Sequence, residues 1–278
     1  MLGAGARAED LQALRHNLGL DQPIYVQYGR FLSNILRGDL GESIVSKQSV
    51  LSALLQRLPV TLVLTVSSLI IAVLLALPLG MLSAIHRTSI LDYGSMSFAL
   101  LGVSAPVFWV GIVFIFIFSF KLSWFPGSGY ASISGNGFAA FIRHLILPSF
   151  ALGLGMAGFL ARITRSTLLD VLGEDYVRTA RAKGLRESLV VMRHGLRNAL
   201  LPLVTVLGLQ FAALMGGAVV TETVFALPGV GRFAVYGIES HDFPVVQGVV
   251  LVVAVVVVAV NVLVDIGYVA LDPRVKYD

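Results

Sequence analysis

The apolar residues of this 278-residue chain are gathered into five long blocks with very few charges. A helix needs about 20 residues at ~1.5 Å per residue to cross a ~30 Å hydrocarbon core, and each block is roughly that long. Because a backbone in lipid must satisfy its own hydrogen bonds, even the valine-rich block near the C-terminus is predicted to be helical. The sequence therefore predicts an all-α transmembrane protein, with spans at 60–85, 94–120, 144–161, 199–221 and 245–269.

The basic residues are sorted by loop. The chain is 56% hydrophobic and 13% charged, which is typical of an integral membrane protein. The basic residues behind its net charge of +4 are not spread over one soluble surface, so we expect no nucleic-acid partner. Loop 162–198 carries eight Lys or Arg, whereas 121–143 and 222–244 together carry three. Since cytoplasmic loops carry an excess of Lys and Arg, 162–198 and the tail 272–278 are predicted to be cytoplasmic and the other two loops external.

This topology places residues 1–58 on the extracytoplasmic side. They carry six Lys or Arg and no apolar run long enough for a span or a signal peptide. Such a segment would not cross a membrane unaided. We therefore expect a further helix upstream of Met1, the alternative being an atypical protein with five spans.

No pattern in the chain is typical of an enzyme. Gly153, Gly155 and Gly158 match G-x-G-x-x-G, but they lie within a span with no strand before them, where small residues let helices approach closely. There is no G-x-x-x-x-G-K-[ST], no cysteine, and no ligand spacing among the five histidines. We expect no catalytic residue, no metal and no cofactor.

A basic helix-glycine-helix segment lies between the third and fourth predicted spans. Asp175 opens a helix where the positive end favours acids, Lys183 closes it, and Gly184 can adopt the left-handed conformation after it. A second helix at 187–198 has too few apolar residues to span a bilayer but enough to dock. Two interpretations are open: an amphipathic helix on anionic headgroups, or a rigid plug in the groove of a cytoplasmic motor domain.

Residues 176–184, Tyr-Val-Arg-Thr-Ala-Arg-Ala-Lys-Gly, and residues 193–202, Arg-His-Gly-Leu-Arg-Asn-Ala-Leu-Leu-Pro, carry a family resemblance. They resemble the cytoplasmic loop of the inner-membrane permease subunits of ATP-binding-cassette (ABC) importers, in the dipeptide and oligopeptide branch. The general motif of that loop begins Glu-Ala-Ala, whereas Arg178-Thr179-Ala180 stands here. Further matching stretches lie in order at 19–23, 38–41, 58–62, 124–126, 144–148, 222–231, 261–265 and 271–274.

The resemblance implies a MetI-like type I permease domain over 59–271, in the inner or plasma membrane, with the first of the family's six spans absent. It implies a transport subunit that is not an enzyme and forms half of a translocation pathway. The implied partners are a second permease subunit, two cytoplasmic ABC ATPase subunits, an extracytoplasmic binding protein and the lipid bilayer. Peptides are the leading cargo, with nickel or glutathione as alternatives. Two other classes are open. A secondary transporter or channel is expected to show charged relays or broken helices at the midplane, and a membrane enzyme to show clustered His, Asp or Glu near an interface.

By resemblance, the loop helix seats in a cleft of an ATPase subunit and moves the spans. The arginines of the loop have an alternative role, which is only to keep the loop on the cytoplasmic side of the membrane. The expected ATPase-coupling residues are Asp175, Tyr176, Arg178, Thr179, Ala180, Arg181, Ala182, Lys183, Gly184, Leu185, Leu189, Met192, Arg193, His194, Asn198 and Pro202.

Polar residues within spans are costly in lipid and are therefore candidates for the pathway. The two near the cytoplasmic end of the last span either face the bundle interior or form hydrogen bonds between subunits. The stretch 221–231 suits a tight turn, which by resemblance lies at the outer gate and otherwise is a plain connecting loop. The candidate pathway or gate residues are Gln210, Glu222, Phe225, Pro228, Gly229, Asn261 and Asp265.

Overall fold

The computed structural model describes residues 21–271, apart from the side chains of 201, 265 and 267–271, and these residues are mainly helical. Arg274 and Lys276 of the predicted tail lie outside the described residues, as does the side chain of Asp265. Within 21–271 the only β-structure is an isolated bridge between Glu42 and Ser49, so the expected all-α fold is confirmed. The helices are α2 (Ile24–Leu36), α3 (Val50–Ile85), α4 (Ile90–Ser104), α5 (Val107–Phe114) with the π-helix η1 (Ile115–Lys121), α6 (Ile133–Leu172), α7 (Asp175–Ala182), α8 (Glu187–Leu189) with the π-helix η2 (Val190–Leu196), α9 (Arg197–Val224), α10 (Val230–Glu239) and α11 (Phe243–Leu271).

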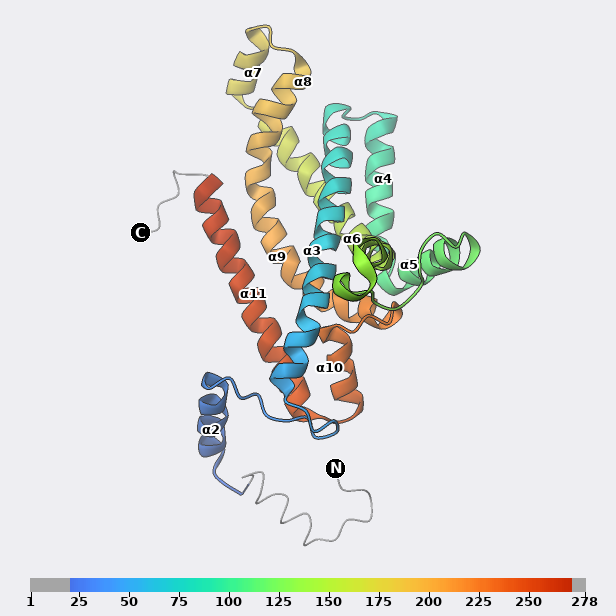
Figure 1. Cartoon of the computed structure of the whole chain (residues 1–278). Helices are drawn as coiled ribbons and strands as arrows, with labels where there is room; N and C mark the ends of the chain where they lie inside the picture. The colour runs from blue at the N-terminus through green and yellow to red at the C-terminus, as the bar shows by residue number, and fades with distance from the viewer. Residues whose placement is uncertain (1–20, 272–278) are drawn as a thin grey trace.

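Four of the described helices are long and apolar enough to cross a membrane: α3, α6, α9 and α11. A fifth span is possible if α4 and the α5–η1 pair are taken together, but these two are bent by 100°. The sequence predicted a span at 94–120, and the structure breaks this stretch into two helices. Pro106 has no N–H and forces the residue before it out of the helical region, so that Ala105 adopts an extended ψ of 127°. Figure 1 shows α5 turned sideways from the end of α4.

The helices extend beyond the predicted spans. α3 has 36 residues and α6 has 40, with a break in α6 at Gly137, where φ is 80°. The predicted docking helix at 187–198 and the predicted span at 199–221 are continuous, because α8, η2 and α9 follow one another without a break from Glu187 to Val224. The docking segment therefore continues directly into a membrane-spanning helix.

Small residues bring the helices of the bundle close together. A Cβ added to Gly153 of α6 would lie 2.6 Å from the carbonyl oxygen of Ser68 in α3, and one added to Gly158 would collide with the carbonyl oxygen of Ala99 in α4. This supports the interpretation of these glycines as packing residues rather than a nucleotide-binding motif. Around them, Leu64 and Leu152 lie in a buried apolar core.

The bundle has two different ends (Figure 1). At one end, α7 and α8 project beyond the long helices. At the other end lie α10, the turn that precedes it and the loop that leads into α3. We call residues 175–196 the coupling segment and residues 221–242 the far-end segment.

Candidate functional site

The coupling segment is folded back on the end of α6. Val177 and Ala180 form the apolar face of α7, and they pack with Val190 of η2 and with Leu172 of α6. Val177 and Val190 are completely buried. This small core fixes the position of α7, so the segment is a compact unit rather than a loose loop.

Gly184 adopts the left-handed conformation that the sequence predicts, with φ of 77°. Its N–H donates to the carbonyl oxygen of Arg181 at 2.9 Å, which ends α7. The Arg181 guanidinium crosses the turn and donates to both carboxylate oxygens of Glu187, at 2.7 and 3.1 Å. This hydrogen-bonded ion pair raises the pKa of Arg181 and lowers the pKa of Glu187. Arg181 therefore joins the two halves of the coupling segment.

The two boundaries of the coupling segment are also joined. Asn198 Nδ2 donates to the hydroxyl of Tyr176 and to the carbonyl oxygen of His194, both at 2.9 Å. Arg178 pairs with Asp175 at 3.1 Å, but both side chains are largely exposed and such a pair contributes little. Asn198 thus connects the start of α7 to the start of α9.

Several large apolar side chains of this segment remain outside its core. The exposed fractions are 43% for Tyr176, 37% for Leu185, 43% for Leu189 and 55% for Met192. Of the other predicted coupling residues, Ala180 is buried, His194 is half-buried and the remainder are exposed: Thr179, Ala182, Lys183, Arg193 and, within α9, Pro202. A fixed frame that exposes apolar side chains is suited to binding another protein.

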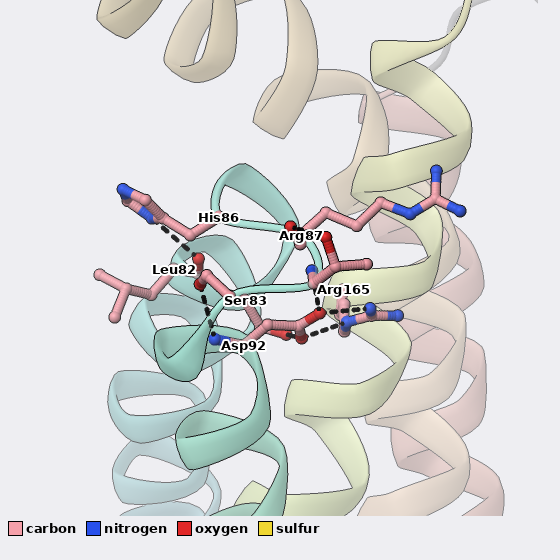
Figure 2. A network of polar contacts seen from close by, with 8 residues as sticks. Leu82, Ser83, His86, Arg87, Asp92 and Arg165 are labelled. Carbon is pink, nitrogen blue, oxygen red and sulfur yellow. Dashed lines mark hydrogen bonds and ion pairs between the residues drawn. The ribbon is translucent and has the colours of Figure 1, made fainter.

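An ion pair between a buried carboxylate and a half-buried guanidinium was not predicted from the sequence (Figure 2). Asp92, in the first turn of α4, accepts hydrogen bonds from Arg165 Nε and Nη2 of α6, both at 2.8 Å. Its carboxylate also accepts from the Ser83 hydroxyl of α3 and from the Thr88 N–H at 3.0 Å. One carboxylate thus joins three helices, and Asp92 is only 4% exposed.

The sequence carries one local signal for Asp92 and none for its pairing with Arg165. Ser89 caps α4 and accepts from the Asp92 N–H at 3.3 Å, so the serine followed three residues later by an acid is a capping pattern. In the sequence, Arg165 is one of the eight Lys or Arg of loop 162–198, which indicate only the topology. Periodicity could not show that the two residues meet, because they are 73 positions apart.

At the far end, Glu222 is completely buried. It accepts from the Thr61 hydroxyl at 2.6 Å and from the Arg232 N–H at 2.9 Å, while the Thr61 hydroxyl oxygen accepts from the Val230 N–H at 2.8 Å. A Cβ at Gly229 would collide with the Glu222 carboxylate. The predicted turn is therefore a closed structure that holds the start of α10 against α3.

The other predicted pathway residues are divided between this turn and the spans. Phe225 is buried, and its carbonyl oxygen accepts from the Gly129 N–H at 2.9 Å, whereas Pro228 is exposed. Gln210 is half-buried in α9, about 18 Å along the helix from Glu222. Asn261 is half-buried in α11. The structure brings Glu222, Phe225 and Gly229 together and leaves Gln210 and Asn261 apart from them.

Asp242 is a second buried acid at the far end, and it was not predicted from the sequence. It is completely buried and accepts from the Ser43 hydroxyl at 2.6 Å and from the N–H groups of Ile44 and Val45 at 3.2 and 3.3 Å. Burial alone would raise the pKa of Asp242, but these hydrogen bonds together outweigh it, so that the pKa is lowered. Asp242 thus fixes loop 43–45 to the start of α11. Among residues 21–271 no group of three or more His, Cys, Asp or Glu is arranged to hold a metal ion.

The long apolar helices with a projecting helical segment define the class of the fold. It is similar to a solved structure of the MetNI methionine ABC transporter in an inward-facing conformation, with a TM-score of 0.64 and 21% identity, over 78% of this chain and 95% of that chain. It is also similar to the crystal structure of an amino acid ABC transporter, with a TM-score of 0.58 and 15% identity, over 78% and 93% of the two chains. The fold is that of the membrane-embedded part of an ABC transporter.

The family follows from the sequence comparisons. Residues 76–277 match the binding-protein-dependent transport system inner membrane component family, and residues 1–65 match the N-terminal family of the same membrane components. The chain belongs to this family and is a multi-pass permease subunit of the inner membrane.

Named relatives cover nearly the whole chain. A putative peptide transport system permease of Brucella abortus (strain 2308) is 46% identical over 276 residues, which are 99% of this chain and 88% of the relative. The glutathione transport system permease GsiC of Escherichia coli (strain K12) is 42% identical over 275 residues, or 99% of this chain and 87% of the relative. GsiC of Pectobacterium atrosepticum is 45% identical over the same proportions.

Proposed function

We propose that this chain forms half of the translocation pathway of an ATP-driven importer of peptides. The proposed complex contains a second permease subunit, two cytoplasmic ABC ATPase subunits and an extracytoplasmic binding protein. The relative named as a peptide permease supports this cargo. The relatives named as glutathione permeases favour glutathione, itself a tripeptide, as the second candidate.

The observation that carries the proposal is the coupling segment. Its core of Val177 and Val190 and its Arg181–Glu187 bridge hold it rigid, while Leu189 and Met192 stay exposed. It is continuous with α9, so a displacement of the segment is passed to a spanning helix without a flexible joint. In this proposal the segment faces the cytoplasm, in agreement with the excess of basic residues in 162–198, and an ATPase subunit covers its exposed apolar side chains.

The far-end turn has a different role in the proposal. Glu222 and Phe225 are closed inside the protein, which favours holding the outer turn in place over lining a water-filled route. Gln210 and Asn261 lie within spanning helices and are the better candidates for lining the pathway.

Transport in proteoliposomes tests the proposal. The permease pair and its ATPase subunits are reconstituted with ATP on the ATPase side and a loaded binding protein on the other side, and the uptake of a labelled dipeptide and of labelled glutathione is measured. We expect ATP-dependent uptake, faster for the dipeptide, and none without the ATPase subunits. Uptake at the full rate without those subunits would contradict the proposal, and preference for glutathione would replace the peptide assignment.

A further inference from the structure

A cavity of about 320 Å³ at the far end carries an excess of positive charge. Arg57 of α3 and Arg232 of α10 both line it, together with Ser46, Gln48 and Tyr236, and no Asp or Glu is among its lining residues. Two guanidinium groups with nearby hydroxyl and amide groups form the donor set that binds a carboxylate in proteins.

The Arg57 guanidinium is already held in position. Its Nη1 donates to the carbonyl oxygen of Ala53 at 2.9 Å, and its Cζ lies 4.3 Å from the centroid of the Phe233 ring. Phe233 is buried and stacks on Tyr236 with a ring separation of 6.4 Å. Because the guanidinium is ordered before any ligand arrives, less side-chain freedom is lost on binding.

The walls of the cavity are fixed as well. Asp242 holds the loop that leads into Ser46 and Gln48, through its bonds to Ser43, Ile44 and Val45. In α10, Glu222 accepts from the Arg232 N–H, and the Arg232 side chain is exposed. The two buried acids thus fix the two walls that carry the polar groups of the cavity.

We infer that this cavity is a docking socket for an acidic side chain on the surface of the extracytoplasmic binding protein. The inference rests on the proposed function, which places this end outside. Two features favour docking over contact with moving cargo. Fixed walls suit a partner of constant shape, whereas a pathway group must change its accessibility during transport. The lining also comes from the first turns of α3, from α10, from the turn at Pro228 and Gly229 and from the loop before α3, and none of it comes from the middle of a span.

Charge reversal tests the socket in the complete importer. In proteoliposomes, the measured quantity is the concentration of binding protein that gives half-maximal stimulation of ATP hydrolysis. For Arg57→Glu and for Arg232→Glu we expect this concentration to rise about tenfold, because a cation that meets an acid becomes a repelling charge. The control is Arg143→Glu, which makes the same change of charge in α6, six residues after the break at Gly137, where the Arg143 guanidinium donates to the carbonyl oxygen of Trp124. It should keep the wild-type value.

Two outcomes would overturn the inference. The first is that Arg57→Glu and Arg232→Glu both co-purify with the ATPase subunits and both keep the wild-type half-maximal concentration of binding protein. The other is a rise of the same size in Arg143→Glu. A wild-type importer that no binding protein stimulates would instead contradict the proposed function itself, so the two failures are distinguishable.

Crosslinking identifies the occupant. The chain has no cysteine, so Ser46→Cys gives a single site for a thiol-linked photoreactive group inside the cavity. We expect an adduct with the binding protein after illumination, and much less adduct from Asn136→Cys, an exposed position in α6. A second result would overturn docking: no adduct forms, and Arg57→Glu impairs the uptake of a free dipeptide but not of its C-terminal amide. This result would assign the cavity to the carboxylate of the cargo.

Discussion

The two ends of this bundle differ in the contacts that hold their backbone in place. In the coupling segment, Leu189 and Met192 are exposed on a rigid frame. In the far-end segment, the acids Glu222 and Asp242 are buried and hold the backbone in place. The coupling segment thus exposes apolar side chains on a fixed frame. The far end is fixed by buried acids and carries a cationic cavity, although Ile238 is also exposed there and the buried Thr221 hydroxyl has no hydrogen-bond partner.

The largest effect on stability is expected from the Asp92–Arg165 ion pair, which joins the helices near the coupling segment. Asp92→Leu removes the carboxylate and leaves Arg165, which is 28% exposed at its side chain, without its partner. We expect the free energy of unfolding to fall by about 3 kcal/mol, measured by denaturation in detergent micelles.

The double variant Asp92→Leu with Arg165→Met is the control for this pair. Because an apolar pair can replace a buried ion pair at little cost, we expect most of the lost stability to return. A double variant as unstable as Asp92→Leu would show that the ion pair is not what joins α4 to α6.

At the far end, the corresponding change is Thr61→Val. It preserves shape but removes the hydroxyl that donates to Glu222 and accepts from the Val230 N–H. We expect a loss of about 2 kcal/mol in the same measurement, because two buried groups lose a partner. Thr65→Val is the matched control, since the Thr65 hydroxyl donates to the Thr61 carbonyl oxygen within its own helix, and it should cost clearly less. Equal losses would contradict the role of the Glu222 turn.

Leu189→Asp should weaken binding of the ATPase subunit without affecting folding. The side chain is 43% exposed, so we expect the free energy of unfolding to change by less than about 0.5 kcal/mol. The amount of ATPase subunit that co-purifies should fall about tenfold. Ile238→Asp, at an exposed position of α10, makes the same kind of change at the far end and should leave this amount unchanged. A similar loss from both variants would remove the distinction between the two ends.

The smallest effect is a pH dependence at the far end. The pKa of Asp242 in the folded protein lies below its ordinary value of 3.8, so its charged form contributes stability above that value. This contribution is lost as the pH falls through the lowered pKa. We expect the melting temperature of wild type to fall more steeply than that of Asp242→Asn in this acidic range. Parallel curves would show that Asp242 does not hold loop 43–45 through its charge.

The sequence predicted what depends on local chemistry. Blocks of apolar residues predicted the helical membrane fold, and the glycine after α7 predicted the left-handed turn at Gly184. The loop motif predicted the family. In each case the determining residues are close together in the chain, so periodicity and residue type are sufficient.

The sequence could not predict what depends on the packing of distant helices. The pair of Asp92 with Arg165 and the contact of Ser43 with Asp242 join residues 73 and 199 positions apart. The bend at Pro106 did have a local signal, but the apolar character of 94–120 outweighed it in the prediction. Long-range polar contacts and proline breaks inside apolar blocks are therefore the features that required the structure.

The most direct test of the account is the amount of peptide moved per ATP hydrolysed by Gly184 variants in proteoliposomes. Gly184 has φ of 77° and open space around it, so a new side chain strains only the backbone. We predict that Gly184→Val moves much less peptide per ATP, whereas Gly184→Asn, which tolerates the left-handed conformation, stays close to wild type. A wild-type ratio for Gly184→Val would contradict the claim that a rigid coupling segment passes the motion of the ATPase to the membrane helices.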